Sequence, residues 1–340
     1  MSSKKRQQLR HGASAVSAVY LLLGAAIAMA QTPAPATPER QAAARQVEEN
    51  NKLPDPTGTG RFAALKEEVA SLPDHVIYRP ANLAGLDQKL GVVAWGNGGC
   101  SNDGASSRFH LLEIASHGYL VIASGRILSG PGASAAEPRP AAQPGQPARP
   151  RTLASDLTDA IDWALAENAR TGSPLQGRVD AEQIAVAGWS CGGLQALRVA
   201  KDPRVRAVVL HNTGVLNGGP TTTIPGMDLT KDALNALHTP VLYILGGPTD
   251  IAYANGMDDF ERIAHVPAAV ANLPVGHGGT FQEPNGGAAA SVALSWLDWQ
   301  LRGDPAAARQ FVGDDCGLCR DRRWTLQRKN FASLAATGSR

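Results

Sequence analysis

A serine framed by glycines stands at the end of an apolar run near the middle of the chain. Residues 184–193 read I-A-V-A-G-W-S-C-G-G, so Ser190 lies between Gly188 and Gly192. A serine nucleophile is presented on a strained strand-to-helix turn, where side chains two positions away would collide with the neighbouring backbone. The apolar run before Ser190 and the helix-compatible residues 194–200 predict such a turn. The pattern therefore predicts nucleophilic catalysis by Ser190; the alternative is a glycine-rich turn without chemistry.

Two residues that could activate this serine follow it along the chain. Asp250 lies in the loop after the apolar run 241–246, and His277 lies in a glycine-rich loop after the run 268–274. A serine hydroxyl is weakly nucleophilic unless a base accepts its proton and a carboxylate orients that base. Because each residue follows a predicted strand, all three are expected at the carboxyl edge of one parallel sheet. The sequence therefore predicts a triad of Ser190, Asp250 and His277.

Other residues compete for the roles of base and acid. Among the eight histidines, His211 also ends an apolar run, but it precedes the acid by one strand. We interpret His211 as structural or pocket-lining. Asp258 and Asp259 are alternative acids, although both fall in the helix predicted over residues 255–265.

A second glycine-rich loop, G-N-G-G-C over residues 96–100, follows the predicted strand 90–96. Backbone N–H groups that converge on one oxygen stabilise the negative charge formed during acyl transfer. One donor is expected from Cys191, directly after the nucleophile, and the second from Asn97 in this loop. The loop glycines allow the backbone to approach a substrate closely. We therefore expect an oxyanion hole formed by the backbone N–H groups of Asn97 and Cys191.

The first 30 residues are typical of a secretory signal peptide. Four basic residues precede an alanine-rich apolar stretch over residues 13–28, and Ala28-Met29-Ala30 supplies small residues for cleavage. An uncleaved anchor is the alternative, but the stretch is short for a membrane span, and we expect no stable membrane anchor. The predicted location is periplasmic or secreted. Without the leader the chain has 28 basic and 30 acidic groups, a net charge of −2, which gives no indication of a nucleic-acid partner.

The chain contains four cysteines, which in an exported protein favour disulfides over metal sites. Two N–H groups aimed at one oxygen bring their backbones within the span of a disulfide. Cys100 and Cys191 are therefore the favoured pair, which leaves Cys316 and Cys319. Four cysteines allow three pairings, however, and the sequence does not decide among them. A free buried thiol at Cys191 is the alternative, and no metal site is expected.

The remaining chain divides into a linker and one domain. Residues 31–60, rich in Ala, Pro, Gln and Thr, are expected to form a flexible linker, and residues 61–340 a single domain. Apolar runs alternate there with helix-like segments, which predicts a mostly parallel sheet with helices on both faces. The predicted strands are 90–96, 119–124, 184–188, 205–211, 241–246 and 268–274, and the predicted helices are 106–116, 153–168, 192–200, 255–265 and 287–301.

A proline-rich segment over residues 130–151 interrupts this alternation. Its composition excludes a helix or a central strand. It is interpreted as an insertion without function or, alternatively, as a mobile flap over the site. The domain ends in a tail that contains Cys316 and Cys319.

These motifs resemble the α/β-hydrolase superfamily over roughly residues 75–312. V-D-A-E-Q-I-A-V-A-G-W-S-C-G-G and S-W-L-D-W-Q-L-R-G-D are similar to a secreted branch with dienelactone-hydrolase-like, chlorophyllase-like and polyester-hydrolase-like esterases. The resemblance implies an α/β-hydrolase fold with an eight-stranded sheet, and hydrolysis of small-molecule or polymeric esters through an acyl-enzyme without a cofactor. The chain departs from the branch at Trp95-Gly96, where many members have His-Gly, and at Cys191, where many have Met, Leu or Gln. These departures leave the ester open, and a serine at position 190 argues against dienelactone hydrolase activity proper, which uses a cysteine.

Two other functions remain as alternatives. G-W-S-C-G-G also resembles the corresponding segment of prolyl-oligopeptidase-type serine peptidases. Those enzymes carry a large additional N-terminal domain, and the segment before the fold is too short to supply one. A non-catalytic, hydrolase-like binding protein is the third possibility, but such a protein would have no need of a complete triad.

Overall fold

The computed structural model describes residues 38–135, 150–218 and 227–331. The predicted leader and residues 136–149 of the proline-rich segment lie outside these ranges. By its contacts the chain divides into residues 1–42 and residues 43–340. Of the first unit, the structure describes the start of helix α1 (Pro38–Asn51).

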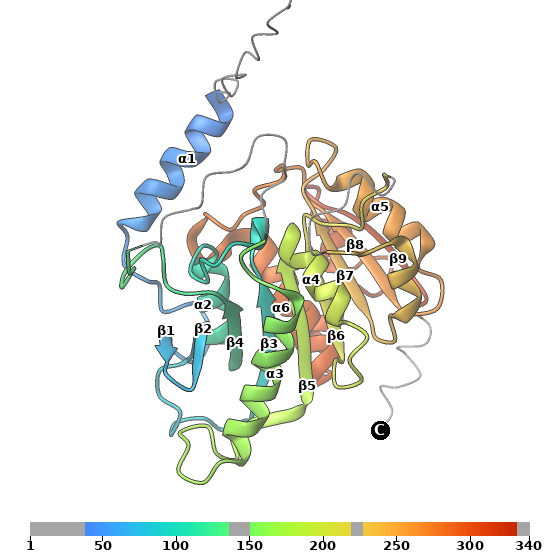
Figure 1. The fold of residues 1–340 in the computed structure, drawn as a ribbon. Helices are drawn as coiled ribbons and strands as arrows, with labels where there is room; N and C mark the ends of the chain where they lie inside the picture. Colours follow the sequence, from blue (N-terminus) through green and yellow to red (C-terminus); the bar gives the residue numbers. More distant parts are fainter. Residues whose placement is uncertain (1–37, 136–149, 219–226, 332–340) are drawn as a thin grey trace, which may run out of the picture. The chain divides into compact units, whose positions relative to one another are not determined.

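A nine-stranded sheet runs through the second unit in the order β1-β2-β4-β3-β5-β6-β7-β8-β9 (Figure 1). The six central strands, β4, β3, β5, β6, β7 and β8, are parallel to one another. At the two edges, β1, β2 and β9 pair with their neighbours in antiparallel orientation. This arrangement confirms the predicted α/β-hydrolase fold. The strand bounds are β1 Ala64–Val69, β2 Leu72–Pro80, β3 Leu90–Gly96, β4 Tyr119–Ser124, β5 Val179–Trp189, β6 Ala207–His211, β7 Val241–Leu245, β8 Ala268–Asn272 and β9 Thr325–Lys329.

Helices cover both faces of the sheet, as predicted. Buried residues of α3, α4 and α5 pack on one face in a core that includes Ile161, Leu197 and Phe260. Those of α2 and α6 pack on the other face, around Leu112 and Trp296. Figure 1 shows α3 and α4 in front of the sheet and α6 behind it. The bounds are α2 Arg108–Ser116, α3 Ala154–Ala169, α4 Cys191–Val199, α5 Tyr253–Arg262 and α6 Gly287–Arg302.

The central strands are apolar because both of their faces are covered. Every residue of β3 and β4 is buried, as expected for parallel strands between two helical layers. Short helices complete the described elements: η1 Gly98–Cys100, η3 Lys231–Ala236, η4 Pro284–Gly286, α7 Pro305–Ala308 and α8 Gly317–Arg320. In the part of the chain that the structure describes, no helix has the length and the hydropathy that a membrane span requires.

The structure differs from the sequence-based expectation at the ends of the domain. Helix α1 lies within residues 31–60, which were expected to be a flexible linker, because its Ala, Gln, Glu and Arg residues are strong helix formers. The end of this helix is fixed, since the buried Asn50 donates from Nδ2 to the backbone oxygen of Gln282 at 2.7 Å. The sheet has nine strands rather than eight because β9, in the cysteine-containing tail, pairs with the edge of β8.

Candidate active site

Ser190 lies on a tight turn between β5 and α4. Its backbone has φ 54° and ψ −119°, a conformation that non-glycine residues rarely adopt. The flanking glycines are required by contact: a Cβ on Gly192 would lie 2.0 Å from the carbonyl carbon of Gly96, and one on Gly188 would lie 2.4 Å from that of Gly192. The turn therefore presses the start of α4 against the end of β3 and holds the hydroxyl beyond the sheet edge.

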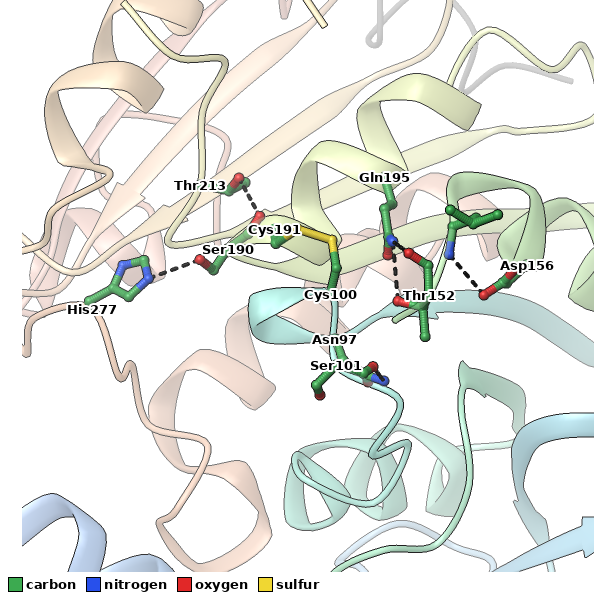
Figure 2. The surroundings of a disulfide bond; sticks show 11 residues. Asn97, Cys100, Ser101, Thr152, Asp156, Ser190, Cys191, Gln195, Thr213 and His277 are labelled. Atoms are coloured by element: carbon green, nitrogen blue, oxygen red, sulfur yellow. Dashed lines mark hydrogen bonds between the residues drawn. A yellow bond between two sulfur atoms is a disulfide. The ribbon is translucent and has the colours of Figure 1, made fainter. Parts of the chain in front are cut away.

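The three residues predicted as a triad form one chain of hydrogen bonds. His277 Nε2 lies 2.9 Å from Ser190 Oγ, and His277 Nδ1 lies 2.6 Å from Asp250 Oδ1. Figure 2 shows the imidazole of His277 directed at the Ser190 hydroxyl. With Nδ1 protonated by its bond to the carboxylate, Nε2 is left as an acceptor for the serine proton. The arrangement has the geometry of a nucleophile, its base and an orienting acid.

The Asp250 carboxylate is buried but well supplied with donors. It is 3% exposed, and its oxygens accept hydrogen bonds from the backbone N–H groups of Ala252 and Gly246 and from Asn212 Nδ2. Burial raises the pKa of Asp250, but the hydrogen bonds from His277 and from these donors outweigh burial and lower it below 3.8. Asp250 is therefore ionised near neutral pH, as the orientation of a histidine base requires.

The structure brings the two expected oxyanion segments together. Asn97 precedes η1, and its buried side chain fixes the loop by donating from Nδ2 to Ser124 O at 2.6 Å and to Ser101 O at 3.0 Å. Cys191 is the first residue of α4, so its N–H has no acceptor inside the helix. A Cβ on Gly192 would lie 2.5 Å from the backbone nitrogen of Asn97, which shows how closely the loop and the turn pack.

A disulfide joins these two segments. Cys100 and Cys191 are bonded with their Cα atoms 5.2 Å apart, and Figure 2 shows the bond directly beside Ser190. The carbonyl of Cys100 also accepts hydrogen bonds from the N–H groups of Arg151 and Thr152, where the chain returns from the proline-rich segment. The second disulfide joins Cys316 to Cys319 in the tail. Both pairs are those that the sequence favoured.

The competing candidates lie elsewhere. His211 is buried among Trp95, His110 and Phe281, with its ring centroid 4.8 Å from that of His110. Burial lowers the pKa of His211 well below its usual value, which keeps its ring neutral.

The two alternative acids belong to an ion-pair network on α5. Asp258 and Asp259 both pair with Lys231, at 2.9 and 2.6 Å. Asp258 also pairs with Arg262. Neither alternative acid takes the place of Asp250 beside His277.

Three residues around the triad were not singled out from the sequence. Trp189 donates from Nε1 to the backbone oxygen of His277 at 2.9 Å, and Thr213 donates from Oγ1 to the backbone oxygen of Ser190 at 2.7 Å. The third is Asn212, which contacts Asp250. Trp189 could have been found from its place beside Ser190, whereas Asn212 and Thr213 carry no signal except that they follow a predicted strand. Among the described residues no group of three or more potential ligands could hold a metal ion.

The region around Ser190 is similar to a known family. The chain matches the PETase family model, described as PET hydrolase-like, over residues 141–214. The matched segment contains β5, Ser190 and α4, whereas Asp250 and His277 lie beyond it. A comparison with curated proteins gave no match. The nine-stranded sheet thus has the α/β-hydrolase fold, and residues 141–214 of the chain are similar to the PET hydrolase-like family.

Proposed function

We propose that the protein is an exported serine hydrolase that cleaves carboxylic esters through an acyl-enzyme. The observation that carries the proposal is the line of hydrogen bonds from Ser190 through His277 to the buried Asp250, at 2.9 and 2.6 Å. The PET hydrolase-like match supports an ester as the bond that is cleaved. A small-molecule or polymeric ester is the proposed substrate.

In the proposed reaction, Ser190 Oγ attacks the ester carbonyl carbon while His277 Nε2 accepts the hydroxyl proton. The new C–O bond converts the carbonyl oxygen into an oxyanion. Collapse of this intermediate breaks the bond to the alcohol, which leaves with the proton from His277. Water then attacks the acyl-enzyme with the same histidine as base, and the acid is released from Ser190.

The proposed oxyanion donors are the backbone N–H groups of Asn97 and Cys191. Fixed donors act without reorganisation during the reaction, and one such donor contributes about 10²–10³ in kcat. The close packing of Gly192 against Gly96 supports this assignment, because it holds both donor segments at one place beside Ser190.

Two features of the chain support export of the protein. The two disulfides support an oxidising compartment, since such bonds rarely persist in the cytosol. The leader-like residues 1–30 support the same location. We propose that the mature chain is periplasmic or secreted, without a stable membrane anchor or a nucleic-acid partner.

A substrate panel tests the proposed reaction. Chromogenic esters of graded acyl-chain length, aryl esters and sugar esters are compared with aminoacyl-proline amides, with Ser190→Ala as the control. We expect turnover of esters that is lost in S190A. Preferential cleavage of the amides would favour a peptidase, and a lack of turnover on both classes would favour a binding protein.

A further inference from the structure

The last residue of β6 and the two residues that follow it contact every segment of the triad. The carbonyl of His211 accepts a hydrogen bond from the N–H of Ser190 at 2.9 Å, and Thr213 Oγ1 donates to the carbonyl of Ser190 at 2.7 Å. Figure 2 shows the Thr213 hydroxyl directed at the backbone of Ser190. Two of these three consecutive residues therefore fix the turn that carries the nucleophile.

Asn212, between them, contacts the other two triad segments. Its Nδ2 donates to Asp250 Oδ2 at 2.9 Å and to the carbonyl of Gly276 at 3.1 Å. Gly276 is the residue directly before His277. A single side-chain amide thus links the carboxylate that orients the base to the peptide that leads into the base.

The backbone places this amide at some conformational cost. Asn212 has a φ of 46°, in the left-handed region that asparagine enters more readily than most residues other than glycine. Its N–H donates to Ile244 O in the neighbouring strand β7 at 2.8 Å. Asn212 as a whole is 2% exposed, so the two hydrogen bonds of its amide are shielded from competition with water.

The charges around this amide are few. Among the described residues, His277 is the titratable group that forms a hydrogen bond with Asp250. Backbone N–H groups of Gly246 and Ala252 supply the other hydrogen bonds to the carboxylate. The neighbouring His211 ring is neutral and faces the aromatic cluster on the other side.

We propose that Asn212 is a positioning residue for the reaction. Its two side-chain hydrogen bonds hold the Asp250 carboxylate and the backbone before His277 in fixed positions relative to each other. The inference rests on the proposed function. The Asn212 amide donates to Asp250 and to the carbonyl of Gly276, and it acts on Ser190 only through Asp250 and His277. Its effect is on the orientation of the His277 ring and on the charge of the carboxylate behind that ring.

The first test is Asn212→Gly, which keeps the left-handed backbone and removes both side-chain hydrogen bonds. We expect kcat to fall about 10-fold to 100-fold, the range for loss of a hydrogen bond to a charged group. Without the amide, more negative charge remains on Asp250 and favours protonated His277. The acid limb of the kcat/KM profile should therefore move to higher pH, which a purely structural role would not cause.

The second variant, Asn212→Asp, preserves the shape of the side chain. Its carboxyl group can donate to Asp250 only while protonated, and once ionised it repels Asp250. The ratio of its kcat/KM to that of the wild type should therefore fall as pH rises. This variant carries the test alone if circular dichroism shows that N212G does not fold.

Asn330→Gly is the matched control. Asn330 also has a left-handed backbone, with a φ of 62°, and its Nδ2 donates to the carbonyls of Ala264 and Val266 at the far end of β8. We expect wild-type kcat and an unshifted pH profile in N330G, whatever its effect on Tm.

The results distinguish failure of this inference from failure of the proposed function. A fluorophosphonate that labels wild-type Ser190 and reacts at the same rate with N212G and N212D, with unshifted pH profiles, would overturn the role of Asn212 alone. Absence of label at Ser190 in the wild type would instead contradict the proposed function.

Discussion

Replacing Cys100 and Cys191 together by alanine removes a cross-link between residues separated by 91 positions. In the chain-entropy model, a closed loop of that length stabilises the folded state by about 4–5 kcal/mol. The same disulfide joins the two segments that carry the proposed oxyanion donors. We therefore expect C100A/C191A to lose both stability and kcat, with KM little changed.

The expected loss in kcat follows from the contacts that remain. Complete removal of one oxyanion donor costs about 10²–10³ in kcat. Here both donors persist, because Gly192 still packs on Gly96 and the carbonyl of Cys100 still accepts from Arg151 and Thr152. A partial displacement of the donors is therefore expected to cost about tenfold in kcat, less than complete removal of one donor.

The matched control is C316A/C319A, which removes a disulfide that spans a sequence separation of 3. The chain-entropy model gives about 2 kcal/mol for so short a loop, and the bond lies in the tail. Urea unfolding followed by tryptophan fluorescence measures stability, and initial rates on a short-chain chromogenic ester, well below Tm, measure kcat. Wild-type kcat in folded C100A/C191A, or an equal loss in both double variants, would refute the role of the disulfide in aligning the donors.

The remaining predictions concern the turn, the acid and the leader. Gly192→Ala should lower the free energy of unfolding by about 1–3 kcal/mol and reduce kcat, because its Cβ would meet backbone atoms at 2.0 Å. In the control Gly85→Ala, the new Cβ meets the Asn82 side chain, at 3.0 Å, and neither stability nor kcat should fall. Equal kcat values in the two variants would contradict this prediction. Asp250→Asn should reduce kcat by about four orders of magnitude and Asp258→Asn should not, and comparable losses would reassign the acid. Because the fold lowers the pKa of Asp250, ionised Asp250 stabilises the folded state above pH 3.8, and this stabilisation is lost as the pH falls further. The Tm of D250N should therefore decrease less on acidification than the Tm of the wild type. Sequencing of exported protein should give Gln31 as the N-terminus, and retention of residues 1–30 would contradict cleavage after Ala30.

The sequence predicted the central strands well because they are buried on both faces. The bounds of β3 and β4 agree with the predicted ranges, and the elements that carry Ser190, Asp250 and His277 occur in the predicted order. The glycines around Ser190 were informative for a physical reason, since backbone contacts at Gly188 and Gly192 leave no room for a side chain.

The edges of the sheet were not predicted because their strands lack a continuous apolar run. β1 reads A-L-K-E-E-V and β9 reads T-L-Q-R-K, without the apolar runs that mark buried strands. Their pairing depends on partners distant in sequence, as β9 does on β8. Asn212 was overlooked for a similar reason, because its contacts with Asp250 and Gly276 arise only when three strand ends meet.

Mass-spectrometric mapping of a fluorophosphonate adduct tests whether Ser190 is the nucleophile, because the reagent phosphonylates an activated serine. Wild-type protein and S190A are treated under the same conditions, digested without reductant and compared peptide by peptide. We expect one adduct, on Ser190, with simultaneous loss of ester hydrolysis and no adduct in S190A. An adduct on another residue, or full ester hydrolysis by S190A, would contradict it.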